Sequence, residues 1–355
     1  MRIHGSLISG LLLAAWLLPG QLFGQEAAPI SRPSAVGSRF WVVSTRDGRE
    51  VEGGLAPAEF RVWRGSSRGI GGECRLEDLV GSLAPQTPLA VMVHGSFVEW
   101  KSVARDAFPT FCWLQGSSPS TPLNVILFSW PSDDTPQMNL AADVNLLGRR
   151  AGLQGMYLAD LLSRISPEHP VCLIGHSHGG RVVAASLHVL GGGQVEGWRF
   201  GGGQFQGHRI RAVLAAAAFD HHWLNPGELY DRVPGRVEKL INLVNQEDLP
   251  LVIYPLRSPA LSQAVALTGF RPADRRAIGP NAGRLLDIDV TDLIQTRHTW
   301  ANYYRQPEIA ALIRPHVFFD GTDDPEAVQK SLQKLSAGPI RESSAETEIP
   351  PGRSK

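Results

Sequence analysis

The chain has 355 residues, 43% of them hydrophobic and 19% charged, which is the composition of a globular protein with enough apolar residues for a core. Its 34 basic side chains equal its 34 acidic ones, and no long block of Lys and Arg occurs, which argues against a nucleic-acid-binding protein. The cysteines (Cys74, Cys112 and Cys172) have no C-x-x-C spacing, so the sequence supports neither a zinc ribbon nor a disulfide framework.

Residues 1–24 have the pattern of a secretory signal peptide. Arg2 is the only charged residue before Glu26, and the apolar run Leu7–Leu18 is shorter than the ~20 residues that span a bilayer. A Pro-Gly break follows and leads to Gly24, where we expect cleavage. We therefore predict an exported protein, periplasmic or extracellular, with no stable membrane span once the signal is removed. An uncleaved anchor is the alternative.

Three further segments complete the predicted organisation. Residues 25–37 form a linker rich in Ala, Pro and Ser, residues 38–335 one α/β domain, and residues 336–355 a disordered tail with almost no large apolar side chains. In an oxidising compartment Cys74 and Cys112 are a conceivable disulfide pair, which the sequence alone does not establish. The sequence does not fix the oligomeric state.

Short apolar runs alternate with helical patterns along the predicted domain. The runs in the middle of the chain are apolar almost throughout, as expected of parallel strands that are buried on both faces. The predicted strands are Phe40–Thr45, Phe60–Trp63, Leu89–Val93, Val125–Trp130, Val171–Ile174, Ile210–Ala217, Lys239–Val244 and Leu286–Val290.

Helices are predicted between these strands, from about residue 141 to 165 and again after residue 178, where apolar residues recur every three or four positions. Strands that alternate with helices predict an α/β fold, in which helices cover both faces of a mostly parallel sheet. Residues 191–207 are rich in glycine and are predicted to form a flexible connection.

The most informative segment is Val171–Val183 (VCLIGHSHGGRVV), in which an apolar strand passes through Gly-His-Ser-His-Gly into a helical pattern. This is G-x-S-x-G in the strand–turn–helix context that a serine nucleophile needs. Such a turn pushes the Ser177 hydroxyl out above the sheet, and the N-terminus of the next helix favours a developing oxyanion. Gly175 and Gly179 are expected to crowd each other across the turn, so neither should tolerate a side chain.

A second G-x-S-x-G occurs at Gly65–Gly69 and is centred on Ser67. It is followed by another glycine turn and not by a helical pattern, so Ser67 is set aside. Ser177 is therefore the predicted nucleophile.

A serine hydroxyl is a nucleophile at neutral pH only with a base, and the base needs an acid that orients it. In this architecture the order along the chain is Ser, then Asp or Glu, then His. His298 is the predicted base, because it lies on a loop between the last strand and the last helix. His188, inside the helix after the serine, and His316, at the end of the last helix, are placed less well.

The acid has three candidates. Asp248 follows the predicted strand Lys239–Val244 and is preferred. Asp220, after the preceding strand, and Glu247, next to Asp248, remain open as alternatives. For each of them, capping a turn is the simpler structural role.

Two backbone N–H groups are predicted to bind the oxyanion. One belongs to His178, the residue after the nucleophile, and the other to Ser96, in the loop Val93–Phe97 (VHGSF) that follows an apolar strand. His94 in the same loop is expected to brace it by hydrogen bonds.

Several segments carry a resemblance to a known family, and they occur here in the family's order: His94-Gly95, Phe128–Ser132 (FSWPS), Gly175–Gly180 (GHSHGG), Asn245–Pro250 (NQEDLP) and His298–Tyr304 (HTWANYY). At these residues the chain resembles the α/β-hydrolases of the lipase and esterase type, particularly a secreted bacterial branch. The resemblance implies the α/β-hydrolase fold, an eight-stranded, mostly parallel sheet with helices on both faces, and a triad of Ser177, Asp248 and His298. His178 stands where the family often has Met or Gln after the serine. The backbone N–H that the oxyanion needs is kept, and the different side chain bears on the shape of the acyl pocket.

Access to the site follows from the same topology. The helix after Ser177 runs away from the active edge of the sheet, so residues 191–207 are not expected to form a lid. Residues 131–140, 220–236 and 249–285 start at that edge. The last two carry apolar side chains that could wall an acyl pocket, with ordinary packing as the alternative.

The sequence thus predicts a serine hydrolase without cofactor or metal that cleaves small-molecule or lipid-like carboxylic esters through an acyl-enzyme. Two alternatives stay open: an exported, non-catalytic binding protein that keeps the fold, and a serine peptidase or acyl transferase with the same triad. Metal catalysis is disfavoured because no HExxH motif accompanies the histidines, which are His176, His178, His221 and His222.

Overall fold

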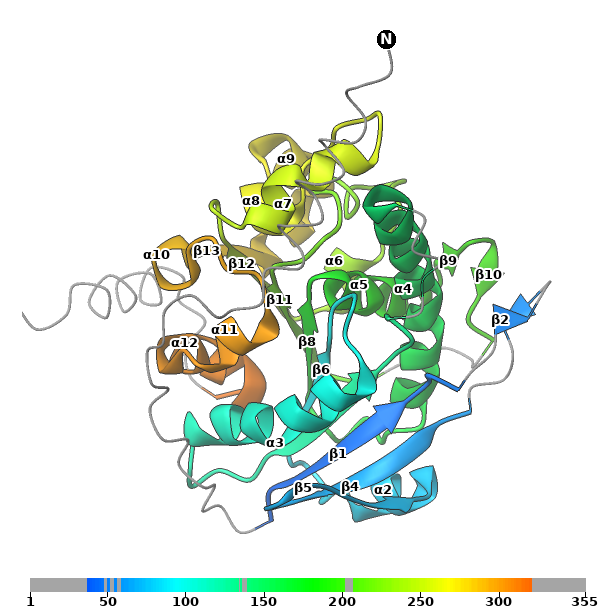
Figure 1. Ribbon diagram of the computed structural model, residues 1–355, viewed down its shortest axis with the longest axis vertical. Coiled ribbons are helices and arrows are strands. Elements are labelled where there is room, and N and C mark those ends of the chain that lie inside the picture. The colour runs from blue at the N-terminus through cyan, green and yellow to red at the C-terminus, as the bar shows by residue number, and fades with distance from the viewer. Residues whose placement is uncertain are drawn as a thin grey trace, which may run out of the picture.

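The apolar runs of the sequence pair into one large sheet in a computed structural model of the protein, drawn in Figure 1. The structure describes residues 37–47, 59–133, 135, 139–201 and 207–320, and the backbone of residues 50–51 and 54–55. Both ends of the chain lie outside the described residues. They comprise the predicted signal peptide, the linker up to residue 36, residues 321–335 of the predicted domain and the predicted tail.

Nine strands form the sheet among the described residues, in the spatial order β13 (Leu285–Asp289), β12 (Lys239–Val244), β11 (Ile210–Ala215), β8 (Val171–His176), β6 (Leu89–Val93), β7 (Asn124–Ser129), β1 (Arg39–Ser44), β4 (Arg61–Ser66) and β5 (Gly69–Cys74). Neighbours from β13 to β1 are parallel, whereas β1 with β4 and β4 with β5 are antiparallel. The mostly parallel α/β architecture predicted from the sequence is confirmed.

The expected count of eight strands was one too low. The additional strand is β5 (GIGGEC), which forms a hairpin with β4 around the second G-x-S-x-G segment, so Ser67 lies at an exposed hairpin turn. Its glycines resemble a turn in sequence, and it forms a strand because its backbone pairs with β4 and not because of its own side chains.

Two short hairpins lie outside the sheet: β2 (Glu50–Val51) with β3 (Gly54–Leu55), and β9 (Gln194–Val195) with β10 (Trp198–Arg199). The second hairpin falls in the glycine-rich segment that was predicted to be a flexible connection, and it gives part of that segment a defined structure. Residues 202–206 of the segment lie outside the described residues.

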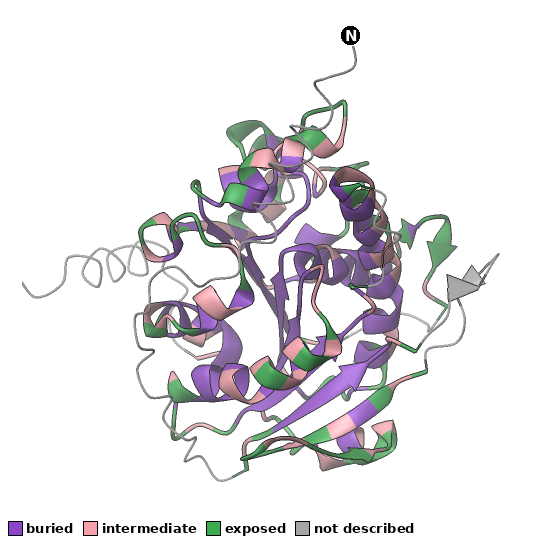
Figure 2. Ribbon diagram, in the orientation of Figure 1, coloured by how far each residue is buried: buried purple, intermediate pink, exposed green. Residues whose placement is uncertain are grey.

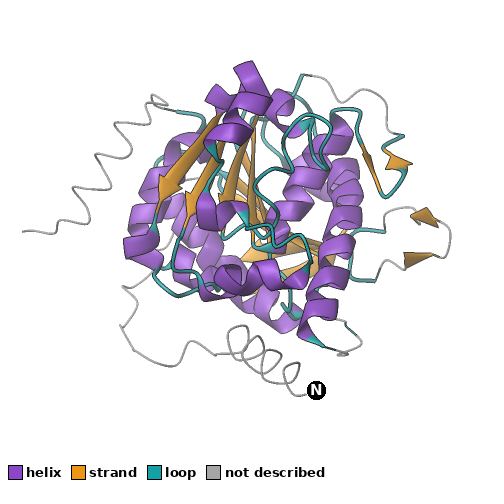
Figure 3. Ribbon diagram, turned by 90° about the horizontal axis from the view of Figure 1, so that it is seen from above, coloured by secondary structure: helices purple, strands orange, loops and turns teal. Residues whose placement is uncertain are grey.

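The helices are α2 (Leu76–Ser82), α3 (Trp100–Gly116), α4 (Leu140–Ser163), α5 (His178–Leu190), α6 (Val233–Arg236), α7 (Leu249–Ile253), α8 (Val265–Thr268), α9 (Pro272–Ile278), α10 (Thr291–Ile294), α11 (Trp300–Tyr304) and α12 (Pro307–Phe318), with 3₁₀ helices η1 (Tyr254–Arg257) and η2 (Gly279–Arg284). α5 packs on β8 and against α4, whereas α3 and α12 pack together, α3 on β5 and β7 and α12 on β11 and β8. Figure 3 shows helices on both sides of the strands. Among the described helices, none is both long enough and apolar enough to cross a membrane.

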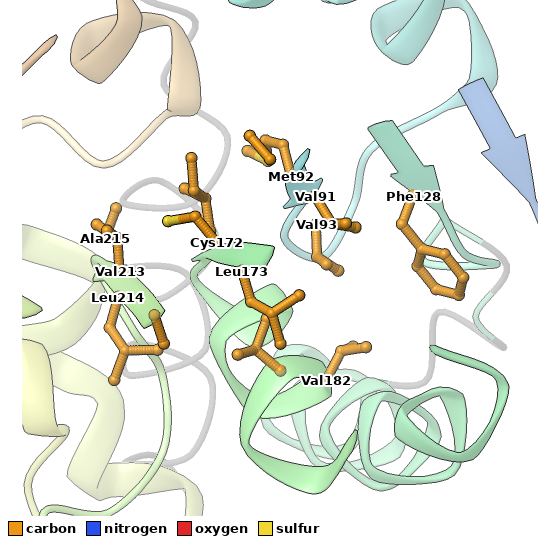
Figure 4. Close-up of a cluster of buried hydrophobic side chains, with 14 of the residues drawn as sticks. Val91, Met92, Val93, Phe128, Cys172, Leu173, Val182, Val213, Leu214 and Ala215 are labelled. Carbon is orange, nitrogen blue, oxygen red and sulfur yellow. The ribbon is translucent and has the colours of Figure 1, made fainter. Parts of the chain in front are cut away.

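The core lies where the two helical layers meet the central strands. Every residue of β6, β7, β8 and β11 is buried, in agreement with their uninterrupted apolar sequence. Figure 2 shows this buried centre surrounded by exposed helix faces, and Figure 4 shows Val93, Leu173 and Leu214 of neighbouring strands on the same side of the sheet as Val182 of α5. Burial of this kind fixes the carboxyl ends of the central strands, on which the candidate site is built.

The cysteines are free thiols. Cys74 is half-buried, and Cys112 and Cys172 are buried. The conceivable Cys74–Cys112 disulfide is therefore not present in the structure.

Candidate active site

Ser177 occupies a strained turn between β8 and α5. Its φ of 53° and ψ of −125° lie outside the usual regions for a residue with a side chain. The turn is held by the Ser177 N–H, which donates to the Ala215 carbonyl at 2.9 Å, and by the Ser177 carbonyl, which accepts from Gly180 and Ala218 at 3.0 and 3.2 Å. Serine at a helix N-cap usually bonds a helical N–H, but this hydroxyl makes no capping bond and is left for another partner.

Three glycines make the turn possible. A Cβ on Gly175 would lie 2.5 Å from Gly180 Cα and 2.7 Å from the Gly179 carbonyl oxygen, while a Cβ on Gly179 would lie 2.2 Å from the Val93 carbonyl oxygen of β6. The expectation that Gly175 and Gly179 crowd each other is thus right for Gly175 only, because Gly179 is confined by the neighbouring strand. Gly95 faces the same turn, since its Cβ would lie 2.8 Å from Ser177 Cβ.

The structure brings Ser177, His298 and Asp248 together in one hydrogen-bonded chain. Ser177 Oγ lies 3.1 Å from His298 Nε2, and His298 Nδ1 lies 2.9 Å from both carboxylate oxygens of Asp248. A carboxylate only accepts, so Nδ1 carries the proton and Nε2 faces the serine hydroxyl as an acceptor. The three residues follow β8, β12 and β13, which end at the same edge of the sheet. The residues that the sequence singled out as nucleophile, base and preferred acid thus lie in hydrogen-bond contact.

Asp248 is completely buried, and its charge is compensated by hydrogen bonds. Besides His298 it accepts the Leu251 N–H at 3.1 Å, so it also caps α7. The capping and orienting roles, which the sequence presented as alternatives, therefore coexist in one carboxylate. A buried carboxylate without such partners would be strongly disfavoured.

The other two candidate acids lie elsewhere. Asp220 forms a buried ion pair with Arg257 and accepts a 3.0 Å hydrogen bond from the Tyr254 hydroxyl. Burial raises the pKa of Asp220, and the Arg257 charge opposes that shift. Glu247 is exposed. Neither bonds His298, so the geometry favours Asp248.

His176 is a site residue that the sequence reasoning passed over. His176 Nε2 lies 2.6 Å from the carbonyl oxygen of His298, so this ring nitrogen donates to the backbone of the candidate base. Burial, with the nearby His298, lowers the pKa of His176 to about 3, which keeps the ring neutral. Trp300 and Tyr303 of α11 pack around the ring, at 5.9 and 5.8 Å between ring centroids. The position before the serine in the motif was the only available signal, and it does not reveal a partner 122 residues away.

Asn245 joins the loops that carry Asp248 and His298. Its buried side-chain amide donates to the Gln295 carbonyl at 2.7 Å, and its N–H donates to the Ala266 carbonyl at 2.8 Å. The NQEDLP segment thus does more than supply an acid, because its first residue holds the base loop at a fixed distance.

Two N–H groups are available beside Ser177 for an oxyanion. His178 is the first residue of α5, and the first N–H groups of a helix have no intrahelical acceptor. Ser96 N–H donates no hydrogen bond within the described residues. Ser96 follows Gly95, which contacts the Ser177 turn, and its hydroxyl lies 2.6 Å from His178 Nδ1.

His94 holds the loop that presents Ser96. Its Nε2 accepts the Trp130 N–H at 3.2 Å, and its Nδ1 donates to the Gly95 carbonyl at 2.8 Å. The indole of Trp130 donates in turn to the His94 carbonyl at 2.8 Å. Burial, with the Arg46 charge, lowers the pKa of His94 to about 3, so the ring is neutral and its two bonds have fixed directions.

Three of the other histidines weighed from the sequence have side-chain or backbone partners of their own, and a fourth is buried in a helix. His188 in α5 accepts the Gln194 N–H at 3.1 Å, and His316 is buried in α12. His221 contacts Asp274 at 2.7 Å, and His222 lies 3.9 Å from Glu228. Among the described residues, no group of three or more His, Cys, Asp and Glu is arranged to hold a metal ion.

Exposed apolar side chains follow the candidate acid. Four exposed apolar side chains lie on α7 and η1 and just beyond them: Leu249, Val252, Leu256 and Leu261, which are 42, 48, 52 and 59% exposed, whereas Ser177 is 1% exposed.

The glycine-rich segment begins at the end of α5 that is opposite Ser177. At 1.5 Å per residue the helix places it about 20 Å from the serine, in agreement with the expectation that it forms no lid over the site.

A comparison with protein-family models agrees with the fold. A family model described as the alpha/beta hydrolase family matches residues 90–352. No curated protein sequence matches the chain. A solved iodinated complex of acetyl xylan esterase aligns with 72% of this chain and 100% of its own at 8% identity, with a TM-score of 0.27, a level that carries no information on substrate. The matched residues make up more than half of the chain and include both Ser177 and His298. The chain therefore belongs to the alpha/beta hydrolase family.

Proposed function

We propose that this hydrolase is a serine hydrolase that cleaves carboxylic esters through an acyl-enzyme. The observation that carries the proposal is the hydrogen-bonded chain from Ser177 Oγ through His298 to Asp248, with contacts of 3.1 and 2.9 Å. A serine on a strained turn, within proton-transfer distance of an oriented imidazole, is the arrangement that nucleophilic catalysis needs.

The reaction follows from these contacts. Ser177 Oγ attacks the ester carbonyl carbon while His298 Nε2 takes the hydroxyl proton, and the resulting oxyanion is bound by the N–H groups of His178 and Ser96. The tetrahedral intermediate collapses, and the departing alcohol takes the proton from His298. Water then attacks the acyl-enzyme with His298 again as the base, which releases the carboxylic acid and restores Ser177. Asp248 keeps its hydrogen bond to Nδ1 and stabilises the imidazolium in both halves.

The apolar surface beside the acid supports an apolar acyl group. Leu249, Val252 and Leu256 recur at helical spacing directly after Asp248, and all three are exposed. Exposed apolar side chains grouped in this way are typical of a surface that binds an apolar ligand. We therefore propose a lipid-like or other apolar ester as the substrate class.

Labelling with a fluorophosphonate tests the proposal. Ser177 should displace fluoride from phosphorus and become labelled, Ser177→Ala should abolish both label and esterase activity, and the matched Ser67→Ala variant should retain both. Folded wild-type protein that takes no label would instead support a non-catalytic binding protein. Label with cleavage of amides and not of esters, or with transfer to an added alcohol or amine in place of hydrolysis, would support a peptidase or an acyl transferase.

A further inference from the structure

The two residues that supply the proposed oxyanion N–H groups also bond to each other through their side chains. Ser96 Oγ lies 2.6 Å from His178 Nδ1, although 82 positions separate the residues in the chain. Ser96 belongs to the loop after β6 and His178 to the first turn of α5. This contact therefore joins the two segments on either side of the point where an oxyanion would lie.

The protein makes room for the His178 ring at a specific place. The ring is buried beneath α4, where a Cβ on Gly148 would lie 2.8 Å from Arg181 Nη1 and 3.5 Å from His178 Nε2. A Cβ at this position of α4 would be in ordinary van der Waals contact with the imidazole, and only the end of the Arg181 side chain would have to shift. Gly148 therefore marks where α4 packs directly against the His178 ring.

The charge state of the ring follows from its surroundings. Burial, then the positive charges of Arg181 and Arg257 and the neighbouring His298, lower the pKa of His178 to about 3, so the imidazole is neutral. Arg181 Nη1 and His178 Nε2 both face the same point over Gly148, and a cation on that side of the ring favours a bare nitrogen at Nε2. The proton of the neutral ring then sits on Nδ1, which donates to Ser96 Oγ.

The loop after β6 is fixed on its far side as well. The Phe97 N–H donates to the Ser132 carbonyl at 2.7 Å, and the Val98 N–H donates to Ser132 Oγ at 3.3 Å. These bonds hold the loop after Ser96 to Ser132. The Ser96–His178 bond links the same loop, through its side chain, to α5.

We propose that His178 and Ser96 are positioning residues whose side-chain hydrogen bond keeps the two oxyanion N–H groups aimed at one point. This inference rests on the proposed function, because it assigns no role without an oxyanion to bind. Displacement of a donor by ~1 Å can cost a catalysed reaction about 10²-fold, so a bond that fixes this distance affects kcat while leaving substrate binding nearly unchanged.

The test uses four variants of the full chain. Ser96→Ala and His178→Leu remove the side-chain bond but keep both backbone N–H groups in the chain. His178→Asn is the conservative variant, because its amide nitrogen stands near the position of Nδ1 and can donate to Ser96 Oγ. The fourth is the double variant Ser96→Ala with His178→Leu, and Ser67→Ala is the control.

Three quantities are measured: kcat per fluorophosphonate-labelled site, KM, and affinity for a trifluoromethyl ketone, which forms an oxyanion on the serine. We expect Ser96→Ala and His178→Leu to lower kcat and ketone affinity together, by roughly 10- to 100-fold, with KM within about 3-fold. His178→Asn should recover most of the loss. The double variant should be no worse than the poorer single variant, because both remove one bond.

The outcomes separate the two proposals. Wild-type protein that takes no label overturns the proposed function and this inference with it. A labelled wild type whose Ser96→Ala variant keeps its kcat per labelled site and its ketone affinity overturns the inference alone. The same conclusion follows if His178→Asn is as impaired as His178→Leu, or if the single losses add in the double variant. If His178→Leu fails to fold, Ser96→Ala decides the question.

Discussion

His176 Nε2 donates a 2.6 Å hydrogen bond to the carbonyl oxygen of His298, so the residue before the candidate nucleophile holds the backbone of the candidate base. Both residues lie at the carboxyl edge of the sheet, one at the end of β8 and one after β13. The bond therefore connects the segment that carries Ser177 directly to the loop that carries His298, although strands β11 and β12 lie between β8 and β13 in the sheet.

Replacement of His176 should lower kcat by misplacing His298. We expect His176→Ala to reduce kcat roughly 10-fold or more, since a general base contributes about 10²- to 10⁴-fold and depends on its alignment. His176→Gln, whose side-chain nitrogen can replace Nε2 as the donor, should retain more activity. Steady-state kinetics with titrated sites measure this effect, and equal kcat in all three proteins would contradict it.

The two buried aspartates should respond differently to replacement by Asn: Asp248→Asn should mainly lower kcat, and Asp220→Asn should mainly lower the free energy of unfolding. Asp248→Asn should lower kcat by about 10⁴-fold, because an amide in place of the acceptor favours the wrong tautomer of His298. Asp220→Asn should leave kcat within about 10-fold of wild type and cost about 3 kcal/mol of unfolding free energy, because it leaves Arg257 buried without a counter-charge. Kinetics and urea unfolding of both variants measure the difference, and the reverse pattern would identify Asp220 as the acid.

Two glycine-to-alanine variants should have opposite effects on stability. Gly179→Ala places a Cβ 2.2 Å from the Val93 carbonyl oxygen, a backbone atom that cannot move aside, and we expect a loss of about 3 kcal/mol or more. A Cβ on Gly81 in α2 has no atom within 4 Å, so Gly81→Ala should stabilise the protein by about 0.5–1 kcal/mol. Urea unfolding of both variants tests this, and a neutral Gly179→Ala would rule out the tight turn.

Acid should destabilise the protein through its buried neutral histidines. His94, His176 and His178 each have a pKa lowered to about 3, so the unfolded chain binds their protons first as the pH falls below about 6.5. The contribution of these histidines to the free energy of unfolding is therefore complete above that pH and is lost as the pH falls toward 3. Each histidine contributes a slope of about 1.4 kcal/mol per pH unit. Urea unfolding between these limits measures the slope, and His94→Gln should reduce it by one histidine's share.

The apolar side chains after Asp248 should matter most for long acyl chains. We expect Val252→Ser and Leu256→Ser to lower kcat/KM for long-chain esters by roughly 10-fold each, on the basis of about 25 cal/mol per Å² of apolar contact, and to change short-chain esters little. Trp198→Ser is a suitable control, because Trp198 is also exposed but lies in the β9–β10 hairpin. A chain-length series decides the matter, and an equal loss on all esters would contradict an acyl-binding surface.

The fold was predictable from the sequence because parallel strands buried on both faces are apolar along their whole length. β6 and β8 are examples, and the strand that escaped prediction, β5, is the one whose stability comes from its neighbour and not from its side chains. The order of Ser177, Asp248 and His298 was likewise accessible, because the topology of the family brings strand ends together in a known sequence. The contacts Ser96–His178 and His176–His298 were not, because each depends on the separation of two loops that only tertiary packing fixes.

Asn245 gives the site a mechanical property. Its amide fastens the loop of Asp248 to the loop of His298, while His176 fastens that second loop to the strand that bears Ser177. A substrate that enters by displacing any one of these loops would have to break one of these hydrogen bonds, so entry is expected without movement of the loops. The side chains that cover the loops can therefore differ between members of the family and change which substrates enter, while the hydrogen-bonded residues beneath keep their relative positions.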